Sequence, residues 1–441
     1  MMLTKQICLS IIQMLLLIAS TFTAGRGQSV NTGLAEQYFQ EARSICDKDG
    51  GKLWGISLYG PMMLVDPVTR EVVANQGDPQ SRLSGKGNVF VGKLPEEVGI
   101  ANTAINWAGV KWTMIIWPLP SAVPARARLM VHELYHRIQD DIGLPASNPS
   151  NNHLDTLEGR LWLQLEWRAL RQGLKHEGAE SRQAVADALI FRARRHQLFP
   201  QSVQSELSLE MNEGLAEYTG IKLRPTPESD SIEFLVKKIE SSESLPTFVR
   251  SFAYASGPAY GFLLDSARPA WRKGLKPTDD LGARLADALS IKLPAKLDQE
   301  AARRMIRYDG RALRASEVER ESNRRKRVAV YRERFVDKPV LIISFTNEVQ
   351  YTYDPNNLEA FDDASTVYPN MTASDVWGIL NVTGGALMTR EAGAIKRVTL
   401  SAPVDTDVRP LRGDGWTVEL KAGWKLAPGA RKGDYVLKND R

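Results

Sequence analysis

Two of the five histidines in this chain stand four residues apart in the segment His132-Glu133-Leu134-Tyr135-His136. Residues at positions i and i+4 share one face of an α-helix, so both imidazoles could reach a single metal ion. Glu133 follows the first histidine and could reach a water molecule on that ion. Zinc with three protein ligands keeps a position for such a water and makes it acidic. The segment therefore predicts Zn²⁺ bound by His132 and His136, with Glu133 as the general base of a hydrolysis.

This site needs a third ligand, and several downstream groups compete for the role. Glu213 is one candidate, and Glu217 follows it by four residues, as expected of a ligand and a carboxylate that supports the site. The adjacent small residues Gly214 and Ala216 indicate close helix packing rather than an exposed helix end. The alternatives are three residues closer to the histidine pair: His153, Asp155 and Glu158.

The two segments together resemble the motifs of gluzincin-type zinc metallopeptidases, the clan of aminopeptidase-N-like and thermolysin-like enzymes. His132–His136 matches the first motif, and Asn212-Glu213-Gly214-Leu215-Ala216 is similar to the Asn-Glu-Gly-x-Ala stretch that carries the glutamate ligand. Glu217 stands where thermolysin-like enzymes place an aspartate. The resemblance implies a zinc peptidase in which an edge strand of a sheet aligns the substrate backbone beside the zinc helix.

A third stretch matches a Tyr-x-x-Gly pattern of the aminopeptidase-like enzymes, in which the tyrosine stabilises the oxyanion of the reaction. Tyr254 with Gly257 has this spacing, and Tyr260 is the reserve. The alternative is that both tyrosines only pack between helices. If the resemblance holds, Tyr254 is a second residue that takes part in catalysis.

The chain departs from the clan in three respects, which limit the resemblance to roughly residues 50–265 and to a clan rather than a named enzyme. Arg137 follows the second histidine, where an uncharged residue is usual. Residues 137–212 separate the two motifs, so two predicted helices must form an inserted hairpin. The Gly-x-Met-Glu-Asn signature of aminopeptidases is absent from the sequence.

The first 27 residues predict a secretory signal peptide. Lys5 precedes the apolar run Ile7–Ala19, which is too short to span a membrane as a helix and is followed by small and polar residues. Cleavage would leave Cys46 as the only cysteine, so no internal disulfide could form. We therefore expect a secreted or periplasmic protein without stable membrane insertion.

Charge and composition narrow the classes of protein to which the chain could belong. The 441 residues include 57 Lys and Arg against 52 Asp and Glu, and the mean hydropathy is −0.29. These values exclude a polytopic membrane protein and a disordered chain, and they give no indication of nucleic-acid binding. The arginine-rich segment 303–334 carries interleaved glutamates, which predicts a solvated helix face.

Hydrophobic periodicity predicts an α+β protein with a mainly helical region at 28–337 and a small all-β domain at 338–441. The resemblance implies that the first region is of the zincin type. Within the first region, residues 50–120 are β-rich and 125–335 are helical. A helix is expected over Leu34–Asp47, and the metal-binding helix over Ala125–Asp141. The expected strands of the first region are Leu53–Tyr59, Met62–Val65, Val72–Ala74, Val89–Val91 and Val110–Trp117.

These features together predict an exported zinc metallopeptidase that hydrolyses peptide bonds in a peptide or protein substrate. The alternative is a catalytically degenerate protein of the same fold that serves for binding or as a scaffold.

Overall fold

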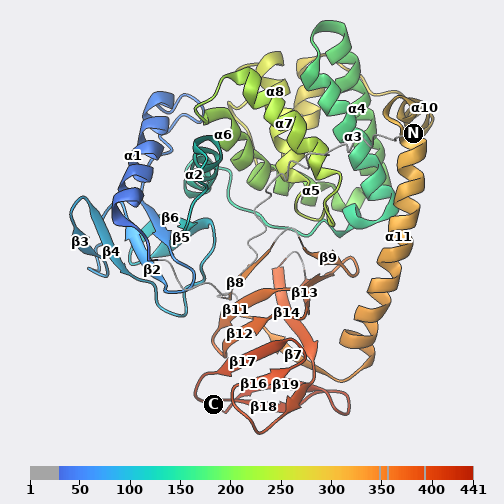
Figure 1. Ribbon diagram of the computed structural model, residues 1–441. Helices are drawn as coiled ribbons and strands as arrows, with labels where there is room; N and C mark the ends of the chain where they lie inside the picture. The colour runs from blue at the N-terminus through green and yellow to red at the C-terminus, as the bar shows by residue number, and fades with distance from the viewer. Residues whose placement is uncertain (1–28, 347–348, 355–356, 392–393, 441) are drawn as a thin grey trace, which may run out of the picture.

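The computed structural model describes residues 29–346, 349–354, 357–391 and 394–440. In this part of the chain a helix and a sheet come first, a helical region follows, and two further sheets form the C-terminal part (Figure 1). The predicted α+β class is confirmed. The predicted signal peptide lies outside the described residues. No described helix has the length and apolar character needed to cross a membrane.

Helix α1 (Thr32–Asp49) covers the N-terminal sheet and is bounded by local capping. The side chain of Asn31 accepts a hydrogen bond from the backbone N–H of Leu34, and Gly50 ends the helix in the left-handed region at a φ of 60°. The buried face of the helix consists of Ala35, Tyr38, Phe39, Ala42 and Cys46. The helix predicted over 34–47 is thus confirmed, with slightly longer bounds.

The N-terminal sheet has the strand order β3-β4-β2-β1-β6-β5 within the described residues. Strands β1 and β6 pair in parallel and the remaining neighbours are antiparallel, so β5 is a free edge beside β6. The strands are β1 (Met62–Val65), β2 (Glu71–Ala74), β3 (Ser84–Lys86), β4 (Val89–Lys93), β5 (Thr103–Trp107) and β6 (Val110–Ile116).

The strand predicted over Leu53–Tyr59 is wrong, because this segment is a loop. Gly51 and Gly55 have φ values of 73° and 81°, which turn the backbone out of an extended path. The apolar side chains of the loop cover the next helix instead of pairing in the sheet. The ring of Trp54 lies 5.1 Å from that of Tyr135, which explains the hydrophobic pattern.

The helical region begins directly after β6 with α2 (Val123–Ile138), which carries the two histidines of the first motif. Helices α3 and α4 pack against each other as a hairpin between the two motifs, as the sequence predicted (Figure 1). The remaining helices are α3 (Leu157–Lys175), α4 (Gly178–Leu198), α5 (Val203–Leu209), α6 (Leu215–Leu223), α7 (Glu228–Ser242), α8 (Ala253–Ala267), α9 (Leu281–Ala288), α10 (Leu297–Arg304) and α11 (Gly310–Arg332).

Short segments of other helix types connect these elements. The important one is η3 (Glu210–Gly214), a π-helical turn between α5 and α6. The others are η1 (Asn152–Asp155), η2 (Pro200–Ser202), η4 (Met305–Tyr308) and η5 (Glu333–Asp337).

Two sheets share one hydrophobic core in the C-terminal part and form a β-sandwich. One sheet has the order β18-β19-β7-β14-β13-β10-β9 and the other β15-β16-β17-β12-β11-β8. The strands are β7 (Val340–Ser344), β8 (Gln350–Tyr353), β9 (Glu359–Ala360), β10 (Ser365–Tyr368), β11 (Met371–Asp375), β12 (Gly378–Val382), β13 (Ala386–Glu391), β14 (Ala394–Ser401), β15 (Pro403–Asp405), β16 (Leu411–Gly413), β17 (Trp416–Leu420), β18 (Trp424–Pro428) and β19 (Tyr435–Asn439).

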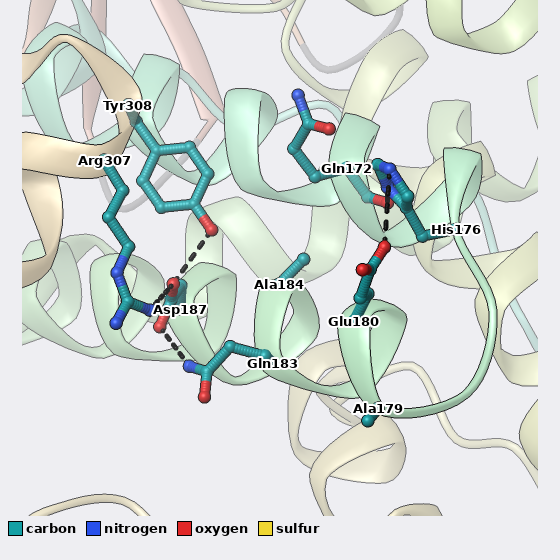
Figure 2. A pocket seen from close by; sticks show the side chains of 9 residues that line it. All are labelled: Gln172, His176, Ala179, Glu180, Gln183, Ala184, Asp187, Arg307 and Tyr308. Carbon is teal, nitrogen blue, oxygen red and sulfur yellow. Dashed lines mark hydrogen bonds and ion pairs between the residues drawn. The ribbon is translucent and has the colours of Figure 1, made fainter.

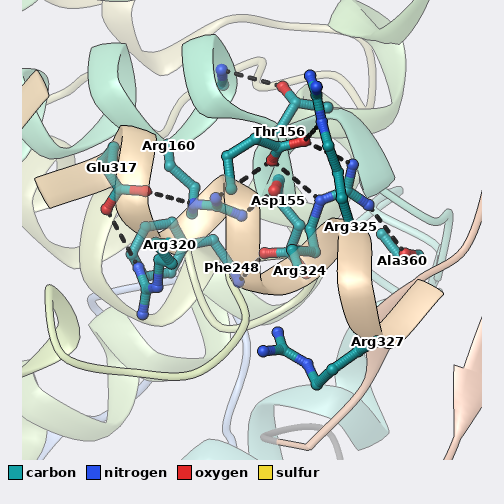
Figure 3. A network of polar contacts seen from close by, with 12 residues as sticks. Asp155, Thr156, Arg160, Phe248, Glu317, Arg320, Arg324, Arg325, Arg327 and Ala360 are labelled. Atoms are coloured by element: carbon teal, nitrogen blue, oxygen red, sulfur yellow. Dashed lines mark hydrogen bonds and ion pairs between the residues drawn. The ribbon is translucent and has the colours of Figure 1, made fainter. Parts of the chain in front are cut away.

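Helix α11 runs along the helical region and leads into the β-sandwich (Figure 1). Two of its three glutamates, Glu317 and Glu321, are buried, which corrects the expectation for this segment in part, whereas Glu319 is exposed as expected. Glu317 is buried and lies 2.5 Å from Nε of Arg160, and Glu321 lies 3.5 Å from the same guanidinium (Figure 3). The interleaved charges therefore anchor α11 to α3 in addition to covering its exposed side.

Polar contacts fix the β-sandwich against the rest of the chain at two further places. Asn152 donates through Nδ2 to the backbone oxygen of Ser365 at 2.9 Å and accepts from Oγ1 of Thr366 at 3.0 Å. The backbone N–H of Gly99 donates to Gln350 of β8 at 3.2 Å. The sandwich thus contacts both the N-terminal sheet and the helical region.

Candidate metal centre

Helix α2 and the π-helical turn η3 bring three metal-ligating side chains together. The Nε2 atoms of His132 and His136 lie 3.1 Å apart, and each lies 3.6 Å from Oε2 of Glu213. In a tetrahedral zinc site with bonds of about 2.0–2.1 Å, neighbouring ligand atoms are separated by about 3.4 Å. The three side chains therefore form a group of suitable spacing for a metal ion.

Hydrogen bonds at the other ring nitrogen orient both imidazoles. Nδ1 of His132 lies 3.1 Å from Oε2 of Glu217, and Nδ1 of His136 lies 2.6 Å from Oε1 of Gln139. The amide nitrogen of Gln139 donates to the backbone oxygen of Leu144, which places its oxygen toward His136. Because both partners accept, each Nδ1 carries a proton, and in the neutral ring each Nε2 is left as an acceptor.

Acceptor atoms from three side chains thus converge on one buried point, an arrangement that a cation stabilises. Burial by itself disfavours a charged imidazole, but the carboxylates of Glu213 and Glu217 outweigh this effect and raise the pKa of His132 to about 10. The site attracts positive charge strongly, whether the charge is a proton or a metal ion.

Glu213 is held by three residues besides the histidines. Asn212 donates through Nδ2 to its Oε1 atom at 3.3 Å. The same oxygen accepts a hydrogen bond from Nη2 of Arg250 at 2.5 Å, and the Oε2 atom of Glu213 accepts one from the hydroxyl of Tyr254. Burial opposes ionisation of Glu213, but the charges of Arg250 and His136 hold the pKa of this carboxyl well below its usual range. Glu213 is therefore an ionised ligand candidate with a fixed orientation.

A close contact between two glycines supports the position of Glu213. A Cβ atom at Gly257 in α8 would lie 2.3 Å from Cα of Gly214, so only glycine allows this approach of η3 and α8. The neighbouring small residues that the sequence singled out thus serve close backbone packing.

Glu133 lies beside the metal-binding group of His132, His136 and Glu213. One of the carboxylate oxygens of Glu133 is free within the described residues. The side chain is buried, and its Oε2 atom has no hydrogen-bond partner in the described part of the chain. Burial raises the pKa of Glu133, while the imidazoles of His132 and His136 oppose this shift. A buried carboxyl group with an unused oxygen next to a metal-binding group has the properties required of a general base or acid.

Tyr254 lies at the metal-binding group, whereas Tyr260, the second candidate for stabilising the oxyanion, lies elsewhere. The ring of Tyr254 stacks on that of His132, with centroids 5.7 Å apart, and its hydroxyl is used by Glu213. Tyr260 is buried and donates to Glu166 at 2.7 Å, within a separate cluster of charges.

The alternative third ligands have other partners. His153 lies 2.6 Å from Glu206, Asp155 accepts from the backbone of Phe248, and Glu158 accepts from Trp162 and Arg314. None of the three belongs to the described group that could hold a metal. Asp155 also lies beside the Arg160 cluster that anchors α11 (Figure 3).

Four polar residues of the site were not predicted from the sequence: Arg128, Gln139, Lys238 and Arg250. Arg128 and Gln139 precede His132 and follow His136 at helical spacing, so the periodicity of α2 could have suggested them. Arg250 has no such signal, because a loop brings it to Glu213.

A cavity of about 370 Å³ lies elsewhere in the helical region, between α3, α4 and η4 (Figure 2). Its main charged group is Asp187, whose carboxylate accepts from Tyr308 at 2.9 Å and from Gln183 at 2.9 Å. This cavity contains none of the residues of the metal-binding group and is lined by partnered charges. The candidate site is therefore the His132, His136 and Glu213 group.

Comparisons with known proteins add no family assignment. No protein-family model matches the chain, and neither a curated protein nor a solved structure matches it. The interpretation of the site consequently depends on its own geometry.

Proposed function

We propose that this chain is an exported zinc-dependent peptidase of the gluzincin type. The observation that carries the proposal is the convergence of His132, His136 and Glu213 beside the free oxygen of Glu133. Two imidazoles and one carboxylate are a ligand set that catalytic zinc sites use, and such sites keep a position for water. A bound zinc ion would polarise the scissile carbonyl and lower the pKa of the attacking water.

The roles of the side chains follow from their positions. Glu133 would take a proton on its free carboxylate oxygen and later pass it to the leaving amine. Tyr254 would donate a hydrogen bond to the oxyanion, which requires its hydroxyl to leave Glu213. The free edge of β5 could pair with an extended peptide, because an edge strand offers unpaired backbone N–H and C=O groups.

Export and the kind of substrate are also proposals. The residues 1–27 support secretion or a periplasmic location, and the buried site beside a sheet edge supports a peptide or protein substrate rather than nucleic acid.

The test combines metal analysis with one isosteric substitution. We expect one zinc ion per chain in protein purified without chelators, and peptide hydrolysis that chelators abolish. Glu133→Gln should keep the metal and the fold but reduce kcat by at least about 10²-fold, because the amide cannot accept the proton. Folded wild-type protein that takes up no zinc would contradict the proposal.

A binding or scaffold protein with a structural metal is the second candidate. The observation that favours it is the engaged state of Tyr254, whose hydroxyl is tied to the ligand Glu213. In that case wild-type protein would bind zinc with the same affinity as Glu133→Gln and neither would hydrolyse any peptide of a mixed library.

A further inference from the structure

Arg250 contacts Glu213 of the metal-binding group, Asn148 and the β-sandwich residue Tyr353. Its Nη2 atom donates to Oε1 of Glu213 at 2.5 Å, and its Nη1 atom donates to Oδ1 of Asn148 at 2.9 Å. Only 13% of its side chain is exposed. Since Arg250 occupies Oε1, the oxygen of Glu213 that faces the imidazoles is Oε2, which lies 3.6 Å from both Nε2 atoms.

The guanidinium of Arg250 also lies near the C-terminal β-sandwich. The ring of Tyr353 in β8 lies 6.0 Å from Cζ of Arg250, at the outer limit of a cation–π contact. Tyr353 is itself fixed, because its ring stacks on that of Tyr351 at 5.8 Å and meets the edge of Tyr368 at 5.0 Å. An aromatic cluster of the sandwich, Tyr351, Tyr353 and Tyr368, therefore lies beside Arg250 and outside the helical region.

The attachment of the sandwich holds this cluster in place. Gln350, at the start of the same strand, accepts a hydrogen bond from the backbone N–H of Gly99. Thr366, two residues before Tyr368, donates one to Asn152. Each of the two contacts therefore lies within two residues of a tyrosine of the aromatic cluster. The distance between Tyr353 and Arg250 is thus determined by how the sandwich docks.

We propose that Arg250 is a positioning residue of the metal site and that the β-sandwich, through Tyr353, sets the metal affinity by holding Arg250 on Glu213. This inference rests on the proposed metal site and not on the proposed peptidase activity. Residues that orient a ligand commonly change metal affinity by about 10- to 100-fold when they are substituted. Because Tyr353 acts on the metal site only through Arg250, its substitution should also lower the metal affinity, but by a smaller factor.

The test is a zinc titration of the full chain against a chromophoric chelator, with Co²⁺ absorption as a report on coordination. We expect Arg250→Met to weaken zinc binding about 10- to 100-fold. Tyr353→Leu should weaken it about two- to tenfold, while Tyr353→Phe, which keeps the ring face, should bind as the wild type does. The matched control is Tyr435→Leu, a half-buried tyrosine of the same sandwich in β19.

A double variant separates positioning from general destabilisation. If Tyr353 acts through Arg250, the variant with both Arg250→Met and Tyr353→Leu binds zinc no more weakly than Arg250→Met alone. The inference is overturned if Tyr353→Leu binds like the wild type, if Tyr435→Leu loses as much affinity, or if the two losses multiply. A wild-type chain that binds no zinc overturns the metal site as well, whereas zinc binding without hydrolysis contradicts only the peptidase.

Discussion

His132 and Glu217 form a buried hydrogen bond in which Nδ1 of the imidazole lies 3.1 Å from Oε2 of the carboxylate. Glu217 is completely buried, and Arg128 and Lys238 also bind it, at 2.7 Å and 3.2 Å. Burial opposes its charge, but Arg128 and Lys238 hold the pKa of Glu217 well below its usual range. An ionised carboxylate therefore fixes the tautomer of His132 and leaves Nε2 for the metal-binding group.

Replacement of Glu217 should damage both the site and the fold. Glu217→Gln removes the charge between Arg128 and Lys238, and we expect a loss of about 3–5 kcal/mol in the free energy of unfolding of the metal-free chain. Zinc affinity should fall by about 10- to 100-fold, because the orientation of His132 is lost. Urea denaturation and a zinc titration measure the two effects.

Glu217→Asp is the control for this prediction, since it keeps the charge and shortens the side chain. Its loss of zinc affinity should be clearly smaller than that of Glu217→Gln. Equal losses in the two variants would mean that the charge of Glu217 does not matter.

The fold class and the residues that meet in the site could be predicted from local patterns. The i and i+4 spacing of His132 and His136 is a property of one helix, and so is the spacing of Glu213 and Glu217. The pattern does not reveal the π-helical turn at 210–214, because five residues are too few for its i to i+5 bonding to change the spacing of the apolar residues. Edge strand β5 was missed because its residues are mostly half-exposed and do not alternate in polarity.

The contacts that involve distant parts of the chain could not be predicted. Arg250 reaches Glu213 through a loop, and Tyr353 belongs to another part of the fold, so neither has a local sequence signal. The segment Leu53–Tyr59 shows the opposite error, since its apolar residues follow a strand pattern but cover α2. Tertiary packing, rather than local propensity, decides such cases.

The glycine contact between η3 and α8 leads to a prediction about packing. Gly257→Ala places a methyl group 2.3 Å from Cα of Gly214, where the nearest atoms are backbone and cannot yield cheaply. We expect a loss of about 1–3 kcal/mol in the free energy of unfolding, and weaker zinc binding because Glu213 is displaced. Thermal and urea denaturation measure the loss.

Gly33→Ala in the first turn of α1 is the matched control, because its nearest neighbour would be 3.6 Å away. This variant should be as stable as the wild type or up to about 1 kcal/mol more stable. If both glycine variants behave alike, the close approach of the helices is not what Gly257 provides.

The anchor of α11 can be tested through Arg160. Arg160→Met removes the closest cation of the buried carboxylate of Glu317, and we expect a loss of about 3–5 kcal/mol in the free energy of unfolding. Arg311 is an exposed arginine of α11, and Arg311→Met should change the free energy of unfolding by less than about 0.5 kcal/mol. Urea denaturation of the two variants beside the wild type decides whether the Arg160 cluster is structural.

The buried thiol of Cys46 predicts a pH dependence of stability. Burial, with Asp49 and Asp47 nearby, raises the pKa of Cys46 from 9.0 to about 12. Between these values the folded chain keeps the thiol proton and the unfolded chain loses it, so stability falls as the pH rises through this window. The contribution is fully present below pH 9.0 and amounts to at most about 1.4 kcal/mol per pH unit.

Comparison with Cys46→Ala isolates this contribution, because all other titrating groups are common to the two proteins. The free energy of unfolding of the wild type should fall more steeply than that of the variant between about pH 9 and pH 11. The native thiol should also be inert to a disulfide reagent at pH 8 and react once urea unfolds the chain, since the thiolate is the reactive form. Parallel pH profiles, or rapid labelling of the native chain, would show that Cys46 is accessible and ionises normally.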